Sequence, residues 1–304
     1  MVLIKRTLNK MAISIWNKYD YVQKMRARIS TPTTWTDVLD VKYSNNRSVI
    51  NGYASTEPAL AAGTRGTAYA YSQFTLTAET LTIDGIEQMA IFIDEADRYQ
   101  QSYVNQMNIA TYHGKKTVEK IETLVLAQHT NWTDFGATDL ANTSDDDTTA
   151  ITVAANNIDD IIRAVKRKIY ANDGVELATE NGIFFVWRAV DFELLEAFVQ
   201  ANGFTEADIG LKNGIAVQKA FRYMGVDHYL SNSHTAGHVF AGIKRMGEIG
   251  ILTGTYGKVK FIEDPPISVT TNAPASGLGI VSRVDYGFDW PAQRAEFMID
   301  LNVT

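Results

Sequence analysis

The residues most suggestive of chemistry are His234 and His238, which stand four positions apart. Two histidines at this spacing can share one face of a helix and bind a metal ion. A metalloprotease helix would carry a glutamate at position 235 as general base, whereas this chain has Thr235. The surrounding segment, SNSHTAGH, predicts a polar turn before a strand. We therefore expect no metal site, and a soluble metal-dependent enzyme using His234 and His238 is kept only as a remote alternative.

Other short motifs also lack a residue that their chemistry needs. The run Asp145–Asp147 has no alternating oxygen ligands or glycine of a calcium loop and predicts a solvated acidic loop. Gly254–Lys258 lacks the Gly-Lys-Ser/Thr ending of a phosphate loop and predicts a turn. Neither a nucleophile elbow nor a glycine-rich dinucleotide fingerprint occurs, and the chain has 0 cysteines. We expect no catalytic residue, no cofactor and no enzyme activity.

The composition is that of an ordinary folded protein. Of 304 residues, 45% are hydrophobic and 21% are charged. No apolar stretch approaches the roughly 18–20 residues that a membrane span requires, so we expect no membrane partner.

Charge is unevenly distributed between the N-terminus and the remainder of the chain. Residues 1–28 hold seven basic side chains against Asp20, and since the whole chain carries −7, the remainder carries −13. The basic segment predicts either docking to an acidic partner or a neighbouring copy, or a solvated helix face. The acidic remainder argues against tight non-specific binding of nucleic acid, which needs many phosphate contacts.

A projecting β-hairpin is predicted before the middle of the chain. Residues 54–68 are small and weakly patterned, which is typical of an exposed loop tip, and residues 69–93 alternate as strands do. Asp84-Gly85 lies between Ile83 and Ile86 and predicts a two-residue hairpin turn. Such an extension cannot bury its own faces in a monomer, so a partner is expected.

A long helix is predicted directly afterwards, from Asp94 to His129. Asp94 is a good N-cap, and Glu95 and Asp97 suit the first turn. A narrow stripe repeats with a period near 3.5, at residues 103, 107, 110, 114, 117, 121, 124 and 128. Thirty-six residues at ~1.5 Å each would span ~54 Å.

The second half of the chain mixes helices and strands without a repeating βαβ unit, which predicts an α+β fold. Ile158, Ile161, Ile162, Val165 and Ile169 share one helix face. We expect a buried strand at 182–188, a helix at 191–200, and further strands at 216–223, 226–230, 238–243, 258–262, 277–286 and 294–303.

An ordered set of segments resembles the tailed-bacteriophage major capsid proteins of the Hong Kong 97-like fold. Residues 81–84 and 90–97 (LTID and AIFIDEAD) are similar to the entry of that family's spine helix. GIFFV at 182–186 followed by DFELL at 191–195 resembles a strand and helix of its axial domain. MGVDHYLSN at 224–232 resembles the strand that follows there.

The resemblance implies a domain organisation. It divides the chain into an N-terminal arm (1–46), an extended β-hairpin loop (47–93), a peripheral domain with the spine helix (94–154), an axial domain (155–275) and returning strands of the peripheral domain (276–304). The loop would lie over an adjacent subunit, and the arm would reach toward a neighbouring capsomer.

The resemblance also implies a function and its partners. The chain would self-assemble into an icosahedral shell of pentamers and hexamers enclosing double-stranded DNA, with weak non-specific DNA contacts, a separate scaffolding protein and a portal protein. It would be located in the virion after assembly in the host cytoplasm. An encapsulin-like compartment shell of the same fold is the alternative.

Contacts between copies are expected from ion pairs between the loop and the spine helix. Aromatic side chains of the loop could also contact another copy, or they could pack within their own strand. The predicted contact residues are Arg65, Tyr69, Tyr71, Phe74, Asp94, Glu95, Asp97 and Arg98.

Overall fold

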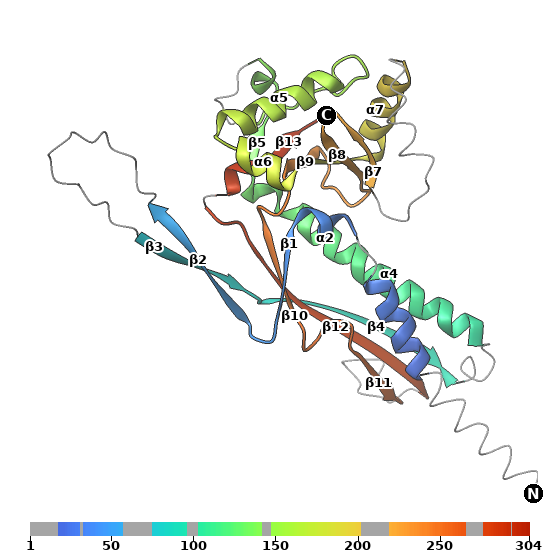
Figure 1. Cartoon of the computed structure of the whole chain (residues 1–304). Helices are drawn as coiled ribbons and strands as arrows, with labels where there is room; N and C mark the ends of the chain where they lie inside the picture. Colours follow the sequence, from blue (N-terminus) through green and yellow to red (C-terminus); the bar gives the residue numbers. More distant parts are fainter. Residues whose placement is uncertain are drawn as a thin grey trace, which may run out of the picture.

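The computed structural model describes residues 18–30, 33–56, 75–95, 103–141, 147–201, 219–265, 276–292 and 294–304. Within these ranges the chain forms a five-stranded sheet, a six-stranded sheet and a separate two-stranded ribbon. Helices lie over the six-stranded sheet, and one long helix runs along the body (Figure 1). The predicted α+β class is confirmed.

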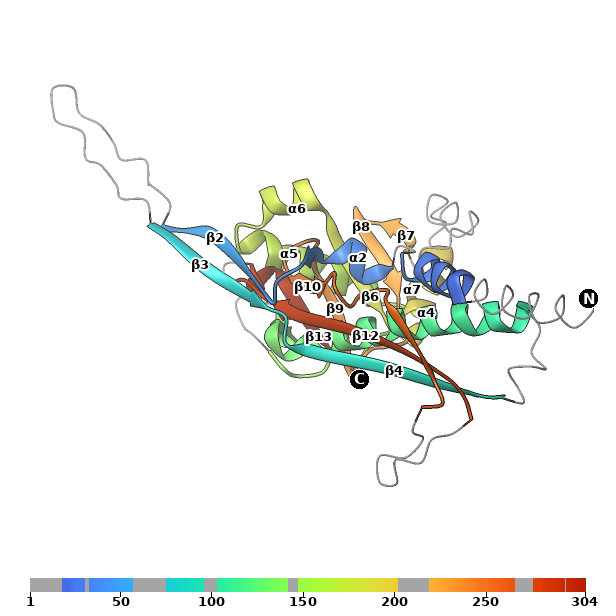
Figure 2. The ribbon, with the colours of Figure 1, turned by 90° about the horizontal axis from the view of Figure 1, so that it is seen from below.

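The five-stranded sheet is organised around one long strand. Its members are β1 (Asp40–Ser44), β4 (Gly85–Asp94), β10 (Glu248–Leu252), β11 (Val259–Glu263) and β12 (Gly277–Asp289). Strand β4 pairs antiparallel with β12 along one edge. On the other edge β11 and β10 pair with successive halves of β12, and β1 joins β10 in parallel. Figure 2 shows β4 and β12 running side by side along the body.

The six-stranded sheet has the order β5-β13-β9-β6-β8-β7. Its strands are β5 (Thr133–Phe135), β6 (Ile183–Trp187), β7 (Lys219–Tyr223), β8 (Val226–Leu230), β9 (His238–Ile243) and β13 (Met298–Asn302). All five residues of β6 are buried, as the apolar run at this position predicts for a central strand. Short elements border this sheet, namely α2 (Thr34–Val38), η1 (Ala127–Asn131), η2 (Thr138–Leu140) and η3 (Ala295–Phe297).

Three helices accompany this sheet: α5 (Ile158–Ala171), α6 (Val175–Asn181) and α7 (Ala189–Ala201). The five predicted isoleucine and valine positions of α5 are all buried, which confirms the predicted amphipathic helix. The helix ends at Ala171 with Asn172 as its C-cap, and Asp173 has a left-handed φ of 57°, a conformation that Asp tolerates better than most residues.

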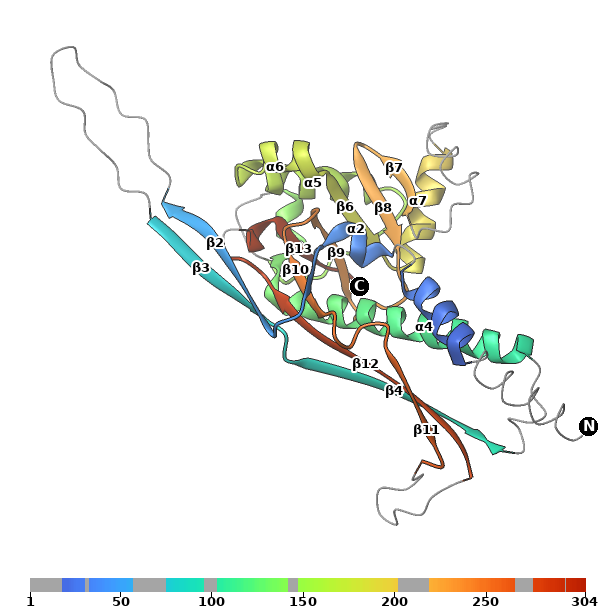
Figure 3. The same cartoon turned by 60° about the horizontal axis from the view of Figure 1, so that its bottom comes forward.

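The projecting ribbon consists of β2 (Ser48–Thr56) and β3 (Thr75–Thr82), paired antiparallel. It leaves the body on one side in all views, most plainly in Figure 3. The prediction of a hairpin turn at Asp84-Gly85 is wrong. Strand β3 pairs with β2 and strand β4 pairs with β12, so the chain passes from the ribbon into the five-stranded sheet at this point.

The ribbon crosses the five-stranded sheet where two glycines face each other. Gly250 of β10 and Gly287 of β12 are directly paired. A Cβ on Gly287 would collide with the Thr82 carbonyl, and one on Gly250 would lie 3.0 Å from the side chains of Leu81 and Ile83. Because neither glycine has a side chain, Leu81 and Ile83 can lie on the sheet, where both are buried.

The long helix α4 spans Tyr103–Leu126, which is 24 residues or ~36 Å, and η1 continues from its end. Asp94, the predicted N-cap, is the last residue of β4 and pairs with Gly277, and Glu95 after it is helical. Residues 96–102 lie outside the described ranges, so a helix that runs unbroken from Asp94 stays a prediction. Strand alternation therefore continues through the position that was expected to cap the helix. The buried face of α4 is also broader than the predicted stripe, since His113, Val118 and Val125 are buried.

A helix over residues 18–29 packs on α4 of the same chain. Its buried residues Tyr21, Met25 and Ile29 follow one another at intervals of four. Gly114 allows the close approach, because a Cβ there would lie 2.9 Å from the Met25 carbonyl oxygen. The described part of the basic N-terminal segment is thus docked on its own subunit.

Candidate intersubunit site

One face of the β2–β3 ribbon is exposed and carries no charge. Side chains alternate along a strand, so this face is formed by Ser48, Ile50, Gly52, Ala78, Thr80 and Thr82. Ile50 lies opposite Thr80 and is 71% exposed. Natural proteins usually protect the open edges of a sheet, often with charged side chains, and within the described residues the ribbon pairs with no further strand. A projecting, uncharged face is therefore the best candidate in the described chain for contact with another molecule.

The root of the ribbon is held by a polar network to the five-stranded sheet. The Asn51 amide of β2 accepts a hydrogen bond from Lys42 Nζ (2.7 Å) and donates one to Glu248 Oε2 (2.5 Å). Lys42 also forms an ion pair with Glu248 at 2.8 Å, and the Glu248 side chain is only 3% exposed. Charge-assisted bonds to a buried carboxylate are the stronger kind, so this network orients the ribbon on the body.

Two further carboxylates lie at the same root with incomplete hydrogen bonding. Glu79 Oε1 of β3 accepts a bond from the Ala292 backbone N–H (3.2 Å). Glu79 Oε2 and Asp289 Oδ2 are buried and have no hydrogen-bond partner within the described ranges. Burial, followed by repulsion from Glu79 and Glu248, raises the pKa of Asp289. The root therefore gathers the carboxyl groups of Glu79, Glu248 and Asp289, and Lys42 and Arg294 both form ion pairs with Glu248.

The predicted contact residues fall into two groups. Arg65, Tyr69, Tyr71, Phe74, Asp97 and Arg98 lie outside the described residues. Asp94 and Glu95 are exposed at the end of β4, where the Glu95 carboxylate accepts a hydrogen bond from the Ser276 hydroxyl. This end of β4 is the opposite end from Gly85, where the chain enters from the ribbon. The structure therefore places these two residues away from the ribbon root within one subunit.

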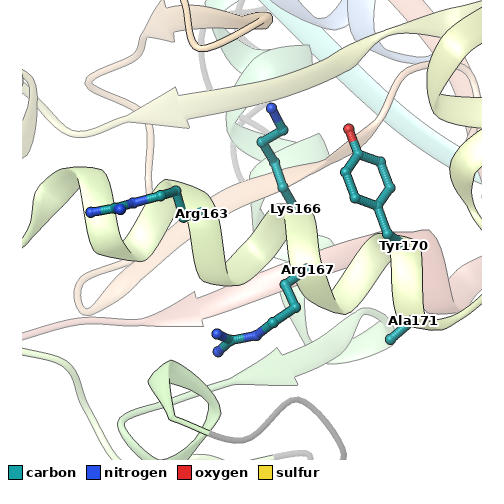
Figure 4. Close-up of a pocket in the computed structure, with 5 residues that line it drawn as sticks. All are labelled: Arg163, Lys166, Arg167, Tyr170 and Ala171. Carbon is teal, nitrogen blue, oxygen red and sulfur yellow. The ribbon is translucent and has the colours of Figure 1, made fainter.

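A shallow hollow of about 480 Å³ lies along α5 and is lined by Arg163, Lys166, Arg167, Tyr170 and Ala171 (Figure 4). Arg163 contacts Asp159 and Asp160 on its own helix, each at 2.6 Å. Lys166 donates to the Met224 carbonyl (2.7 Å), and Arg167 donates to the Leu140 carbonyl (2.8 Å). These side chains attach α5 to the neighbouring turn and loop, so the hollow is a structural feature rather than a preformed anion site.

The two histidines of the sequence motif, His234 and His238, do not share an interaction partner in the cluster around Asp300. His238 stacks on His129 with 3.8 Å between ring centroids, and both bind Asp300. His234 is not among these converging ligands, and its Nε2 has no hydrogen-bond partner in the described part of the chain. Sequence reasoning missed His129 and Asp300 because nothing local connects three such distant positions. The segment at 254–258 forms a turn, as expected.

Within the described ranges, no helix combines the length and apolar character needed to cross a membrane.

Comparison with known proteins finds solved structures that have a similar architecture. No protein-family model and no curated protein matches the sequence. Among solved structures, one from Gordonia phage Cozz has a TM-score of 0.57 at 11% identity and covers 92% of this chain and 86% of its own. The mature capsid of bacteriophage PhiM1 has a TM-score of 0.54 at 12% identity, covering 90% and 88%.

A virus-like particle from Pyrococcus furiosus has a TM-score of 0.54 at 9% identity and covers 93% of this chain and 98% of its own. These similarities extend over 90–93% of this chain. The chain therefore has the Hong Kong 97-like fold, the fold of tailed-phage major capsid proteins.

Proposed function

We propose that this chain is a major capsid protein that self-assembles into an icosahedral shell of pentamers and hexamers enclosing double-stranded DNA. The observation that carries the proposal is the match of nearly the whole chain to a phage capsid subunit. The proposed role is to build the shell, and the proposal includes no catalytic group and no cofactor. The proposed location is the virion, after assembly in the host cytoplasm.

The exposed ribbon face supports self-association. A two-stranded ribbon is at best marginally stable alone in water, and this one has an exposed Ile50 on a face without charges. Covering this face with a second copy of the chain would remove apolar surface from water. In the proposed shell, the extended loop (47–93) lies over the adjacent subunit, and the arm (1–46) begins with residues that reach toward a neighbouring capsomer.

The remaining chain is assigned by the same proposal. Residues 155–275 form the axial domain at the capsomer centre, and 94–154 with 276–304 form the peripheral domain. Ion pairs and aromatic contacts between copies are assigned to Arg65, Tyr69, Tyr71, Phe74, Asp94, Glu95, Asp97 and Arg98. Each exposed pair would contribute only ~0–1 kcal/mol, so stability depends on many contacts acting together.

Three other partners belong to the proposal. A separate scaffolding protein would guide assembly, a portal protein would occupy one vertex, and packaged DNA would touch the shell weakly. The net charge of −7 is consistent with weak rather than tight DNA contact, because an acidic protein releases few counterions from DNA.

An encapsulin-like compartment shell is a second candidate for a specific reason. The similarity to the virus-like particle from Pyrococcus furiosus covers 98% of that chain, more than for the two phage structures described above. The two candidates share the shell and differ in its content, which is DNA in one and protein cargo in the other.

Negative-stain microscopy followed by analysis of the particle contents tests both candidates. The chain, expressed with its neighbouring genes, is expected to give uniform closed particles that protect DNA from nuclease. Particles that protect a protein and no DNA would favour the compartment shell. Uniform monomers in the presence of a scaffolding partner would contradict both candidates.

A further inference from the structure

Three potential metal ligands from distant parts of the chain converge beside the end of α4. His129 lies in η1, His238 begins β9, and Asp300 lies in β13. Asp300 Oδ2 is 2.8 Å from His238 Nδ1 and 3.2 Å from His129 Nδ1. One ligand atom from each of the three side chains lies within 4.8 Å of the others.

The surroundings of Asp300 favour a positive charge at this point. The Asp300 side chain is only 2% exposed, and its carboxylate lies against the imidazoles of both His129 and His238. A buried carboxylate is stable only when paired or coordinated to a cation. Neutral imidazoles can donate hydrogen bonds to it, but a bound cation would neutralise its charge more completely.

Two of the separations between ligand atoms are close to those of a zinc centre. Zinc–nitrogen and zinc–oxygen bonds of about 2.0–2.2 Å place neighbouring ligand atoms roughly 3.3 Å apart. The observed separations of 2.8 and 3.2 Å are near that value, whereas the His129 and His238 rings are stacked with 29° between their planes and must rotate for both Nδ1 lone pairs to point at one ion. Two imidazoles with one carboxylate suit a borderline divalent cation such as Zn²⁺ rather than Ca²⁺ or Mg²⁺.

Access to the cluster is also available. The side chains of His129 and His238 are 16% and 24% exposed, so the site is reachable from solvent while Asp300 lies beneath them. We propose that His129, His238 and Asp300 form a binding site for a divalent cation of the zinc type, with water completing the coordination. This proposal rests on geometry within one subunit and does not depend on the proposed function.

A bound cation would act as a cross-link inside the subunit. It would join η1, which follows the long helix, to two adjacent strands of the six-stranded sheet. The chain has no cysteine, so no disulfide can serve this purpose. Binding requires both Nδ1 atoms to be free of protons, so each neutral imidazole must carry its proton on Nε2.

Isothermal titration of the untagged full-length chain with Zn²⁺ tests the proposal. We expect one equivalent to bind, a rise in Tm on the order of 5 °C at a hundredfold excess over Kd, and loss of both effects on chelation. His129→Gln and Asp300→Asn should each weaken binding by at least about tenfold. His234→Gln is the matched control, because it removes a neighbouring imidazole outside the cluster.

The outcomes separate the proposal from its alternatives. Binding that survives His129→Gln and is lost in His234→Gln would overturn it in favour of the pair His234 and His238. Substoichiometric binding that is unchanged in all variants would mean adventitious surface binding and would also overturn it. If Asp300→Asn fails to fold, the visible spectrum of Co²⁺ added to the unaltered chain decides, since a tetrahedral site gives intense absorption bands and free Co²⁺ does not.

Discussion

At the scale of single residues, His228 of β8 and His234 of the loop before β9 make the subunit sensitive to acid. The Trp187 indole N–H donates to His228 Nδ1 at 2.9 Å, so this nitrogen must be unprotonated. Burial lowers the pKa of His228 to about 4. Burial and the nearby Arg188 guanidinium lower the pKa of His234 to about 4 as well. Both side chains are therefore held neutral in the folded state.

The consequence is a loss of stability as the pH falls. An unfolded histidine has a pKa near 6.5, so below that pH the unfolded chain binds protons that the folded chain does not. The free energy of unfolding is therefore fully available above about pH 6.5 and declines toward pH 4, by up to about 3 kcal/mol for each histidine. Urea titrations of the unassembled subunit at several pH values measure this decline.

A His228→Gln variant isolates one contribution. The glutamine carbonyl can still accept the Trp187 hydrogen bond but cannot titrate. We expect the variant to be less stable than the natural chain at pH 7 and to lose less stability between pH 6.5 and 4. An unchanged slope with pH would show that His228 is not the titrating group.

At the scale of elements, the crossing of the ribbon over the five-stranded sheet depends on the absence of side chains. The paired glycines Gly250 and Gly287 make space for the segment from Leu81 to Ile83. This contact positions the ribbon relative to the body, whereas the outer part of the same ribbon lies free of the sheet.

Gly287→Ala should therefore be strongly destabilising. Its Cβ would meet the Thr82 carbonyl, which is backbone and cannot rotate away, so we expect a loss of about 2–3 kcal/mol in the free energy of unfolding. Gly52→Ala is the matched control, because nothing lies within 4 Å of a Cβ at this ribbon position. It should change stability by less than about 0.5 kcal/mol. Equal effects of the two substitutions in urea unfolding would contradict this account of the crossing.

At the scale of the whole molecule, stability of the subunit and assembly of the shell depend on different residues. Buried residues such as Leu81 stabilise the single chain, whereas exposed Ile50 is available only to a partner. A substitution on the exposed ribbon face can therefore separate folding from assembly.

Ile50→Arg is the sharpest such substitution. We expect little change in the unfolding of the monomer, because the side chain is 71% exposed. Burying an unpaired charge at every ribbon contact should raise the subunit concentration needed for assembly by at least about tenfold. Light scattering with a constant amount of scaffolding protein measures this concentration.

Val190→Arg provides the comparison. Val190 is 68% exposed on α7, away from the ribbon, so the substitution makes the same change of chemistry elsewhere. Normal assembly of Ile50→Arg would show that the ribbon face is not buried between copies.

An element of this fold could be predicted closely when the pattern that defines it lies within a few neighbouring residues. The helix α5 and the strand β6 were predicted closely, because isoleucines at helical spacing and an unbroken apolar run define burial within a few residues. Asp84-Gly85 has the composition of a hairpin turn, yet the strands on either side pair elsewhere. Turn composition permits a reversal, but the partner of each strand is decided by packing far along the chain.

The sequence by itself determined the α+β class, most elements of the second half and the presence of a projecting extension. These features could be predicted because periodicity, turn residues and the absence of motifs can be read from residues that are close together in the sequence. Only the tertiary structure decided that β4 continues through Asp94 and that Gly250 faces Gly287. It alone brought His129, His238 and Asp300 together. Such contacts join segments far apart along the chain, and no local pattern records which distant residue will complete a sheet or a ligand set.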